Sequence, residues 1–215
     1  MNQEELDKMY MRRCLQLAKQ GRALAKPNPM VGAVIVYQGR ILGEGYHVRC
    51  GQAHAEVNAF ASVRPADEPL LSQSTLYVSL EPCCHTGKTP PCADLIIRNQ
   101  VKRVVCGCID PFAQVHGRGV QKLRDAGIDV TVGVLGDECR ALNRQFNVYN
   151  THERPYILLK WAQTSNGFLD ADGEALALST PFTQMLVHRL RAQYEAILVG
   201  RVTDEREHPC LTVRE

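Results

Sequence analysis

The sequence lacks the features that would place it in or across a membrane. Its 215 residues contain no apolar run that approaches the roughly 20 residues needed to span a bilayer. The opening residues, 1–5, are polar and acidic and have no apolar core of the kind found in secretory signals. We therefore expect a cytoplasmic protein with no membrane partner.

The sequence also lacks a charge excess and is poor in aromatic residues. The formal net charge is only +2, and aromatic residues make up 6% of the chain. Proteins that grip long nucleic acids usually carry a clear basic excess, and RNA-binding sites use exposed aromatic rings. The composition favours a small-molecule substrate and no nucleic-acid partner.

Cysteine, by contrast, is abundant, with nine residues and no recognisable signal peptide. In a reducing compartment, metal binding or catalysis explains cysteines better than disulfides do. A second metal site at Cys106 and Cys108 is the less favoured interpretation of that pair. We expect small buried side chains at Cys14, Cys50, Cys106, Cys108, Cys139 and Cys210.

Hydrophobic periodicity predicts an α/β domain. The expected helices cover residues 4–20, 53–62, 93–98, 118–126 and 137–149, and the expected strands cover 30–37, 41–47, 76–80, 101–109 and 128–134. Strands alternate with helices from residue 75 onward, which predicts a mostly parallel sheet with helices on both faces. A hairpin at Gln38-Gly39 would make that sheet mixed.

A short polar segment at residues 151–155 is expected to link two domains. It separates a domain at residues 1–150 from residues 156–215, where the pattern restarts. Strands are expected there at 156–162 and 196–199, with a helix from Thr180 to about residue 193. Because about sixty residues bury little surface, we expect a fragment whose remainder is missing.

One group of residues has the spacing of a catalytic zinc site. His54 precedes Glu56 by two positions, and Pro82-Cys83 and Cys92 follow. A histidine and two cysteines leave the fourth zinc position open, as catalytic sites do. H-x-E followed by P-C-x-x-C is the signature of zinc nucleobase deaminases, although the gap between the cysteines is longer here.

Helix geometry says how these residues can converge. Residues two apart on a helix point about 200° apart, so His54 and Glu56 meet only if the metal lies off a helix N-terminus. Cys92 follows two prolines at another expected helix start. Glu56 would then act as general acid and base for a zinc-activated water. The alternative is a structural zinc closed by Cys84, which would not need Glu56.

Longer stretches resemble the bifunctional deaminase/reductase of riboflavin biosynthesis. The eight-residue insert between the cysteines, ending in Gly-Lys-Thr-Pro-Pro-Cys, is specific to that family. The resemblance covers the whole chain and breaks off within the reductase domain, so a truncated member is expected. The other matching stretches are residues 27–36, 43–47, 54–59, 110–111, 115–119, 155–160 and 190–192.

The resemblance implies zinc-dependent deamination of 2,5-diamino-6-(5-phosphoribosylamino)pyrimidin-4(3H)-one, a phosphorylated pyrimidine. It also implies a second, dihydrofolate-reductase-like α/β domain that uses NADPH to open the ribose of the product. The first domain is then a cytidine-deaminase-like three-layer α/β/α sandwich with a mixed sheet. The resemblance further implies self-association, while the residues themselves leave the oligomeric state open.

By resemblance, Asn28, His47, His85 and Lys88 line the deaminase pocket. Lys88 suits a phosphate group. Other roles stay open, namely a turn residue at Asn28, a strand-end histidine at His47 and a solvated lysine at Lys88.

In the second segment the resemblance assigns two sets of residues. Asn166 replaces an aspartate that is usual in the family, and we expect NADPH binding to be weak or absent in this fragment. Surface solvation remains the alternative for the arginines. The cofactor positions are Ala162, Ala177, Thr203 and Glu207, and the substrate positions are Ala175, Arg191, Leu211 and Arg214.

Two other functions remain open. One is a different zinc deaminase, acting on cytosine nucleotides or on adenosine in tRNA. The other is a zinc-stabilised binding module without catalysis, in which Glu56 has no chemical role.

Overall fold

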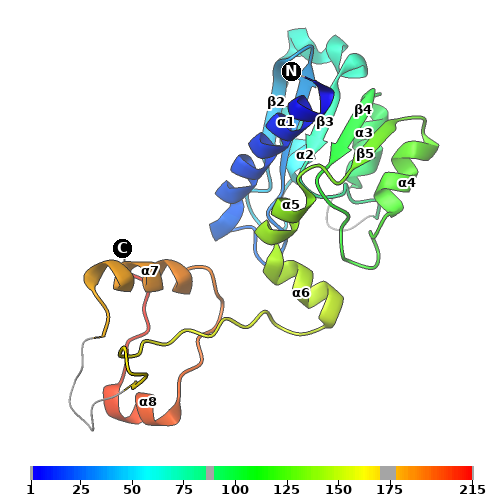
Figure 1. Ribbon diagram of the computed structural model, residues 1–215. Coiled ribbons are helices and arrows are strands. Elements are labelled where there is room, and N and C mark those ends of the chain that lie inside the picture. Colours follow the sequence, from blue (N-terminus) through cyan, green and yellow to red (C-terminus); the bar gives the residue numbers. More distant parts are fainter. Residues whose placement is uncertain (1, 86–89, 170–177, 215) are drawn as a thin grey trace. The chain divides into compact units, whose positions relative to one another are not determined.

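The computed structural model describes residues 2–85, 90–169 and 178–214, which form two compact units, Met1–Tyr156 and Ile157–Glu215 (Figure 1). Each unit is described by itself. The first unit contains helices α1 (Gln3–Ala18), α2 (Ala55–Ala61), α3 (Cys92–Arg98), α4 (Arg118–Asp125), α5 (Gly136–Leu142) and α6 (Arg144–His152), and strands β1 (Gly32–Tyr37), β2 (Arg40–Tyr46), β3 (Thr75–Val78), β4 (Arg103–Cys106) and β5 (Asp129–Val132).

The strands form one five-stranded sheet in the order β2-β1-β3-β4-β5. Strand β1 is antiparallel to β2 and β3, whereas β3, β4 and β5 are parallel, so the predicted mixed sheet is confirmed. The predicted hairpin turn has positive φ at Gln38 (47°) and Gly39 (80°). Two positive φ angles are what a two-residue hairpin turn of the favoured hand requires.

The side chains of β1 alternate between two hydrophobic cores, as a strand buried on both faces should. Ala33 and Ile35 pack in one core with α2, α3 and α4. Val34 and Val36 pack in the other with α1 and Cys139 of α5. The predicted three-layer α/β/α sandwich is therefore confirmed (Figure 1).

Two glycines of β2 bring α2 close to the sheet. A Cβ on Gly43 would lie 2.4 Å from the Ala59 carbonyl oxygen, and one on Gly45 would lie 2.5 Å from the Ala59 nitrogen. Only glycine allows this approach of helix to strand. The N-terminus of α2 is thereby held against the end of β2.

The strand register brings five chain segments to one edge of the sheet. The paired row consists of Tyr46, Gly32, Val78, Cys106 and Val132 or their immediate neighbours. The carboxyl ends of β2, β3, β4 and β5 and the amino end of β1 therefore meet there. Ligand sites in α/β folds lie outside such an edge.

Three details of the first unit differ from prediction. The helix expected at 137–149 is two helices, broken at Asn143 (φ −108°, ψ 31°), because the Asn143 side chain bonds the main chain of Met30. Helix α6 continues to His152, so the expected linker begins in helical residues. A 3-10 helix, Pro65–Gln73, was not predicted.

Most of the remaining cysteines are buried as expected, but two are not. Cys14, Cys106, Cys108 and Cys139 are buried, whereas Cys50 is half-buried and Cys210 is exposed. Cys106 and Cys108 lie in different hydrophobic cores. That separation argues against a second metal site at this pair.

The described part of the second unit contains helices α7 (Pro181–Arg191) and α8 (Arg201–Glu207). Thr180 caps α7 as predicted, its hydroxyl accepting the Thr183 N–H. The strands predicted at 156–162 and 196–199 are wrong, because both segments are irregular and no described residue of this unit pairs with them in a sheet. Their apolar side chains are exposed, as Leu159 (77%) and Leu198 (98%) show.

No helix in the described parts of either unit has the length and apolar character that crossing a bilayer requires.

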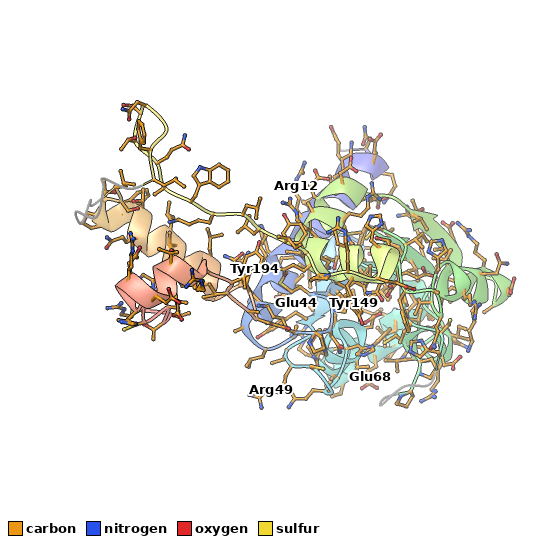
Figure 2. The ribbon with its side chains drawn as sticks, turned by 90° about the horizontal axis from the view of Figure 1, so that it is seen from below. Arg12, Glu44, Arg49, Glu68, Tyr149 and Tyr194 are labelled. Carbon is orange, nitrogen blue, oxygen red and sulfur yellow. The ribbon has the colours of Figure 1, made fainter. Side chains whose placement is uncertain are left out.

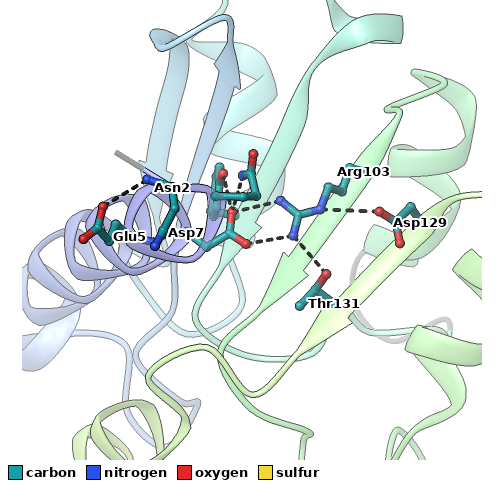
Figure 3. Close-up of polar contacts among 8 residues, drawn as sticks. Asn2, Glu5, Asp7, Arg103, Asp129 and Thr131 are labelled. Atoms are coloured by element: carbon teal, nitrogen blue, oxygen red, sulfur yellow. Dashed lines mark hydrogen bonds and ion pairs between the residues drawn. The ribbon is translucent and has the colours of Figure 1, made fainter.

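A buried ion pair joins α1 to the sheet. Arg103 of β4 donates to both oxygens of Asp7, at 2.9 and 2.8 Å, and Tyr77 donates to the same carboxylate (Figure 3). Burial pushes the pKa of Asp7 upward, but the hydrogen bonds from Arg103, Gln3 and Tyr77 outweigh it and leave that pKa below its usual value. The ionised carboxylate therefore stabilises the fold.

We predict that Asp7→Asn lowers the free energy of unfolding by about 2–4 kcal/mol at neutral pH, because Arg103 keeps its charge and loses the carboxylate that accepts two of its hydrogen bonds. The native pKa of Asp7 is depressed, so this contribution is present above the unfolded-state pKa of about 3.9. It is lost as the pH falls through the native value. Urea unfolding at pH 7 and at about pH 2 should show the difference between parent and variant shrinking in acid.

The matched control is Asp129→Asn, on the other side of Arg103, where the carboxylate is 71% exposed and 3.4 Å from Arg103 Nε. An exposed pair contributes less than about 1 kcal/mol. Equal destabilisation by the two variants would contradict the assignment.

Candidate metal centre and active site

The N-termini of α2 and α3 carry residues of the predicted constellation. His54 is the N-cap of α2, Glu56 lies in the first turn, and Cys92 is the first residue of α3. Cys83 lies in the segment after β3, where its carbonyl oxygen accepts the Ala93 N–H at 3.0 Å. The two helix starts expected from the sequence therefore face the same point.

The donor atoms of His54, Cys83 and Cys92 lie within 4.8 Å of one another. His54 Nδ1 is 3.6 Å from Cys83 Sγ and 3.3 Å from Cys92 Sγ. Tetrahedral zinc, with bonds of about 2.3 Å to sulfur and about 2.0 Å to imidazole, separates such atoms by about 3.5 Å. This donor set fits a zinc ion.

Cys84 does not join this group. Its Sγ lies 3.9 Å from the Gln114 carbonyl oxygen. Among the described residues, the three-donor cluster contains His54, Cys83 and Cys92 only. The arrangement favours an open site over one closed by a fourth cysteine.

The side chains of the site shift one another's pKa values. Hydrogen bonding from Cys92 lowers the pKa of the Cys83 thiol, and the same bond together with burial raises the pKa of Cys92. The hydrogen bond to Cys83, opposed by burial, raises the pKa of His54. The pair of sulfurs thus holds negative charge, which suits a cation.

Glu56 is buried, with 4% of its surface exposed. Burial, with the nearby Cys83 charge, raises the pKa of Glu56 to about 7. A carboxyl group beside three metal-binding atoms can accept and return a proton near neutral pH.

His54, Cys83 and Glu56 line a cavity of about 430 Å³. Asn28, His47 and His85, three of the predicted pocket residues, line it together with Glu56. Lys88 lies outside the described residues. The structure therefore brings together those predicted deaminase residues that it describes.

His47 and Asn28 form a hydrogen-bonded pair beside the metal ligands. His47 Nδ1 lies 3.0 Å from the Ala53 carbonyl oxygen, which can only accept, so Nδ1 carries the hydrogen. His47 Nε2 then accepts from Asn28 Nδ2 at 3.1 Å. Burial lowers the pKa of His47, which favours a neutral ring. Its bond to Asn28 fixes the orientation of that amide, so the amide oxygen points away from His47.

His85 offers a polar atom to the cavity wall. Its Nδ1 is buried and has no hydrogen-bond partner among the described residues. The ring packs edge-on against Phe112, with centroids 6.0 Å apart. An unpaired buried nitrogen at a cavity wall suits a polar ligand group.

The described structure places the predicted reductase positions in several segments of the second unit. Arg191 donates to the Thr212 carbonyl oxygen at 3.1 Å, which places it near the segment containing Leu211 and Arg214. Ala162 lies in an irregular segment, whereas Thr203 and Glu207 lie on α8. Ala175 and Ala177 lie outside the described residues.

Several residues that line the cavity carry no motif that would predict their role. Asp110, Phe112 and Val115 follow β4, and Phe146, Tyr149 and Asn150 lie on α6. Burial raises the pKa of Asp110 to about 6. In the sequence, residues 110–111 and 115–119 stand out only as stretches that match the family, and α6 has no motif.

Glu81 ties the Cys83 segment to its neighbours. Its buried carboxylate accepts the N–H groups of Asp110 (3.2 Å), Gly117 (2.8 Å) and Val120 (3.1 Å). These donors belong to the loop after β4 and the start of α4. Glu81 stands two residues before Cys83, so this network fixes where the sulfur lies.

We expect Glu81→Gln to weaken zinc affinity by about 10–100-fold, as changes behind metal ligands do. The amide presents one oxygen and an NH₂ group that opposes backbone donors, so the three bonds cannot all persist. Competition with a chromogenic chelator measures the affinity. Asp7→Asn is the control, since it destabilises the fold away from this loop, and equal zinc affinity in Glu81→Gln and the parent would disprove the role.

Comparisons with known proteins give matches in both halves of the chain. The family model of the cytidine and deoxycytidylate deaminase zinc-binding region matches residues 4–108, and that of the RibD C-terminal domain matches residues 155–215. Riboflavin biosynthesis protein RibD of Aquifex aeolicus (strain VF5) is 48% identical over 98% of this chain and 58% of its own length. RibD of Escherichia coli (strain K12) is 46% identical over 97% of this chain and 56% of its own length.

Solved structures show the same relationship. A diaminohydroxyphosphoribosylaminopyrimidine deaminase/5-amino-6-(5-phosphoribosylamino)uracil reductase from Thermotoga maritima matches with a TM-score of 0.91 and 43% identity, over 99% of this chain and 60% of its own. Acinetobacter baumannii RibD, form 1, matches with a TM-score of 0.91 and 39% identity, over 99% and 59%. The chain spans a little more than half the length of these relatives, and it is similar to RibD proteins over nearly all of its own length.

Proposed function

We propose that this chain catalyses the hydrolytic deamination of 2,5-diamino-6-(5-phosphoribosylamino)pyrimidin-4(3H)-one in riboflavin biosynthesis. The observation that carries the proposal is the convergence of His54, Cys83 and Cys92 with Glu56 at the buried end of a 430 Å³ cavity. Relatives whose names include this activity support the substrate.

In this proposal, His54, Cys83 and Cys92 would hold a zinc ion, which when bound would supply a water molecule activated for attack. Glu56 would take one proton from the water and deliver it to the ring nitrogen as the oxygen bonds to the ring carbon. It would then carry the proton of the resulting hydroxyl group to the departing amine. The carbon–nitrogen bond to the amine breaks, ammonia leaves and the ring carbon becomes a carbonyl. The neutral His47 ring orients the Asn28 amide toward the substrate.

Residues 1–150 are proposed as the deaminase domain, 151–155 as the linker and 156–215 as the N-terminal part of a reductase domain. In the whole protein this second domain would reduce the deaminated product with NADPH. The match of residues 155–215 to the RibD C-terminal domain supports this assignment. By resemblance, Lys88 and His85 would serve the substrate of the first domain, and Arg191 and Arg214 that of the second.

The cellular setting is also proposed. Nine cysteines that are free in the structure support a cytoplasmic location. The near-balanced charge supports a small-molecule substrate without nucleic acid. Self-association is proposed from the family resemblance alone.

Two substitutions separate catalysis from metal binding. Glu56→Gln is expected to lower turnover by at least about 10³-fold, because the proton carrier is lost, while zinc content stays at one ion per chain. Cys92→Ser is expected to release the metal. Ammonia release and metal analysis on the same samples test both.

A binding module without catalysis would make parent and Glu56→Gln equally inert toward every aminopyrimidine tried. The proposed substrate is wrong if ammonia is released faster from cytosine nucleotides, or from adenosine in tRNA, than from the diaminopyrimidinone nucleotide.

The reductase portion is expected to bind NADPH weakly, because Asn166 replaces an aspartate that is usual in the family. Titration with NADPH, followed by nucleotide fluorescence, should show no saturation up to about 1 mM. Tight, saturable binding would contradict this expectation.

A further inference from the structure

One wall of the catalytic cavity comes from α6, the helix that ends the first unit. Phe146, Tyr149 and Asn150 all line the cavity. Their spacing of three and four places them on one face of the helix. This face is uncharged and carries two aromatic rings.

Asn143 fixes the start of α6 to the segment before β1, which forms another part of the cavity wall. The Met30 N–H donates to Asn143 Oδ1 at 2.7 Å, and Asn143 Nδ2 donates to the Met30 carbonyl oxygen at 2.8 Å. Asn143 is buried, and Met30 lies between Pro29 and Val31, which both line the cavity. The two hydrogen bonds therefore set the separation of two cavity walls.

The aromatic rings of α6 lie at the open side of the cavity. Helix α6 itself contains no fully buried residue. Tyr149 is 64% exposed (Figure 2), whereas Glu56 at the other end is buried. A ligand that fills the cavity removes the surface of these aromatic rings from water, and this burial favours binding.

The reacting carbon must lie beside Glu56, so the rest of the nucleotide extends toward the open side. Resting on the function proposed above, we propose that Phe146 and Tyr149 contact the bound nucleotide beyond its reacting carbon and determine substrate affinity. Asn143 is a positioning residue for this wall. The α6 wall thus selects a substrate with a large group attached to the pyrimidine ring.

The test is steady-state deamination by the full chain with Phe146→Ala and Tyr149→Ala. Each variant should raise KM about 10-fold or more, as truncation of a buried aromatic contact does, with kcat within about 3-fold of the parent and zinc content unchanged. Thr151→Ala is the control on the same helix, because Thr151 is exposed and bonds only within α6 in the described structure. It should leave KM unchanged.

Asn143→Ala should raise KM like the aromatic variants, again without loss of zinc, which a general folding defect would not reproduce. If the parent is active and the KM of both aromatic variants stays within about 2-fold, the α6 wall is rejected and the proposed deamination stands.

If the parent is inactive, the proposed deamination fails, and calorimetry with 5-amino-6-(5-phosphoribosylamino)uracil decides the inference. About 10-fold weaker binding to the aromatic variants than to the parent supports it. Equal binding, or no binding to the parent, overturns it.

Discussion

The site depends on two helix N-termini that meet outside one edge of the sheet. An N-terminus presents unpaired N–H groups and a positive partial charge, and here the starts of α2 and α3 contribute His54 and Cys92. Cys83, between them in the chain, completes the donor set. The positive ends of the two helices favour negative charge at this point, and hydrogen bonding lowers the pKa of the Cys83 thiol.

Contacts distant in sequence keep this arrangement in register. Gly43 and Gly45 let α2 approach β2, the Glu81 carboxylate joins three backbone N–H groups behind Cys83, and Asn143 holds α6 against the segment before β1. Each acts through the main chain, whose position decides where the neighbouring side chains point. The cavity is thus shaped by hydrogen bonds that do not themselves touch the reacting atoms.

The clustering of His54, Cys83 and Cys92 was predictable from the sequence because its signals are local. Helix starts, the proline before Cys83 and the apolar alternation of β1 each depend on a few neighbouring residues, and the structure confirms the sandwich they imply. The bond from Asn143 to Met30 spans 113 positions and leaves no periodic trace, so the α6 wall went unpredicted. The strands expected at 156–162 and 196–199 failed for a related reason. An apolar pattern predicts which side chains a strand would bury, but a strand also needs a neighbouring strand to accept and donate its backbone hydrogen bonds.

X-ray absorption at the zinc edge of the purified chain tests the central claim most directly. The account predicts one zinc per chain with two sulfur ligands at about 2.3 Å and two nitrogen or oxygen ligands at about 2.0 Å, one of which exchanges with added small anions. A chain that retains no zinc, or a shell with three sulfurs and no exchangeable position, would contradict it.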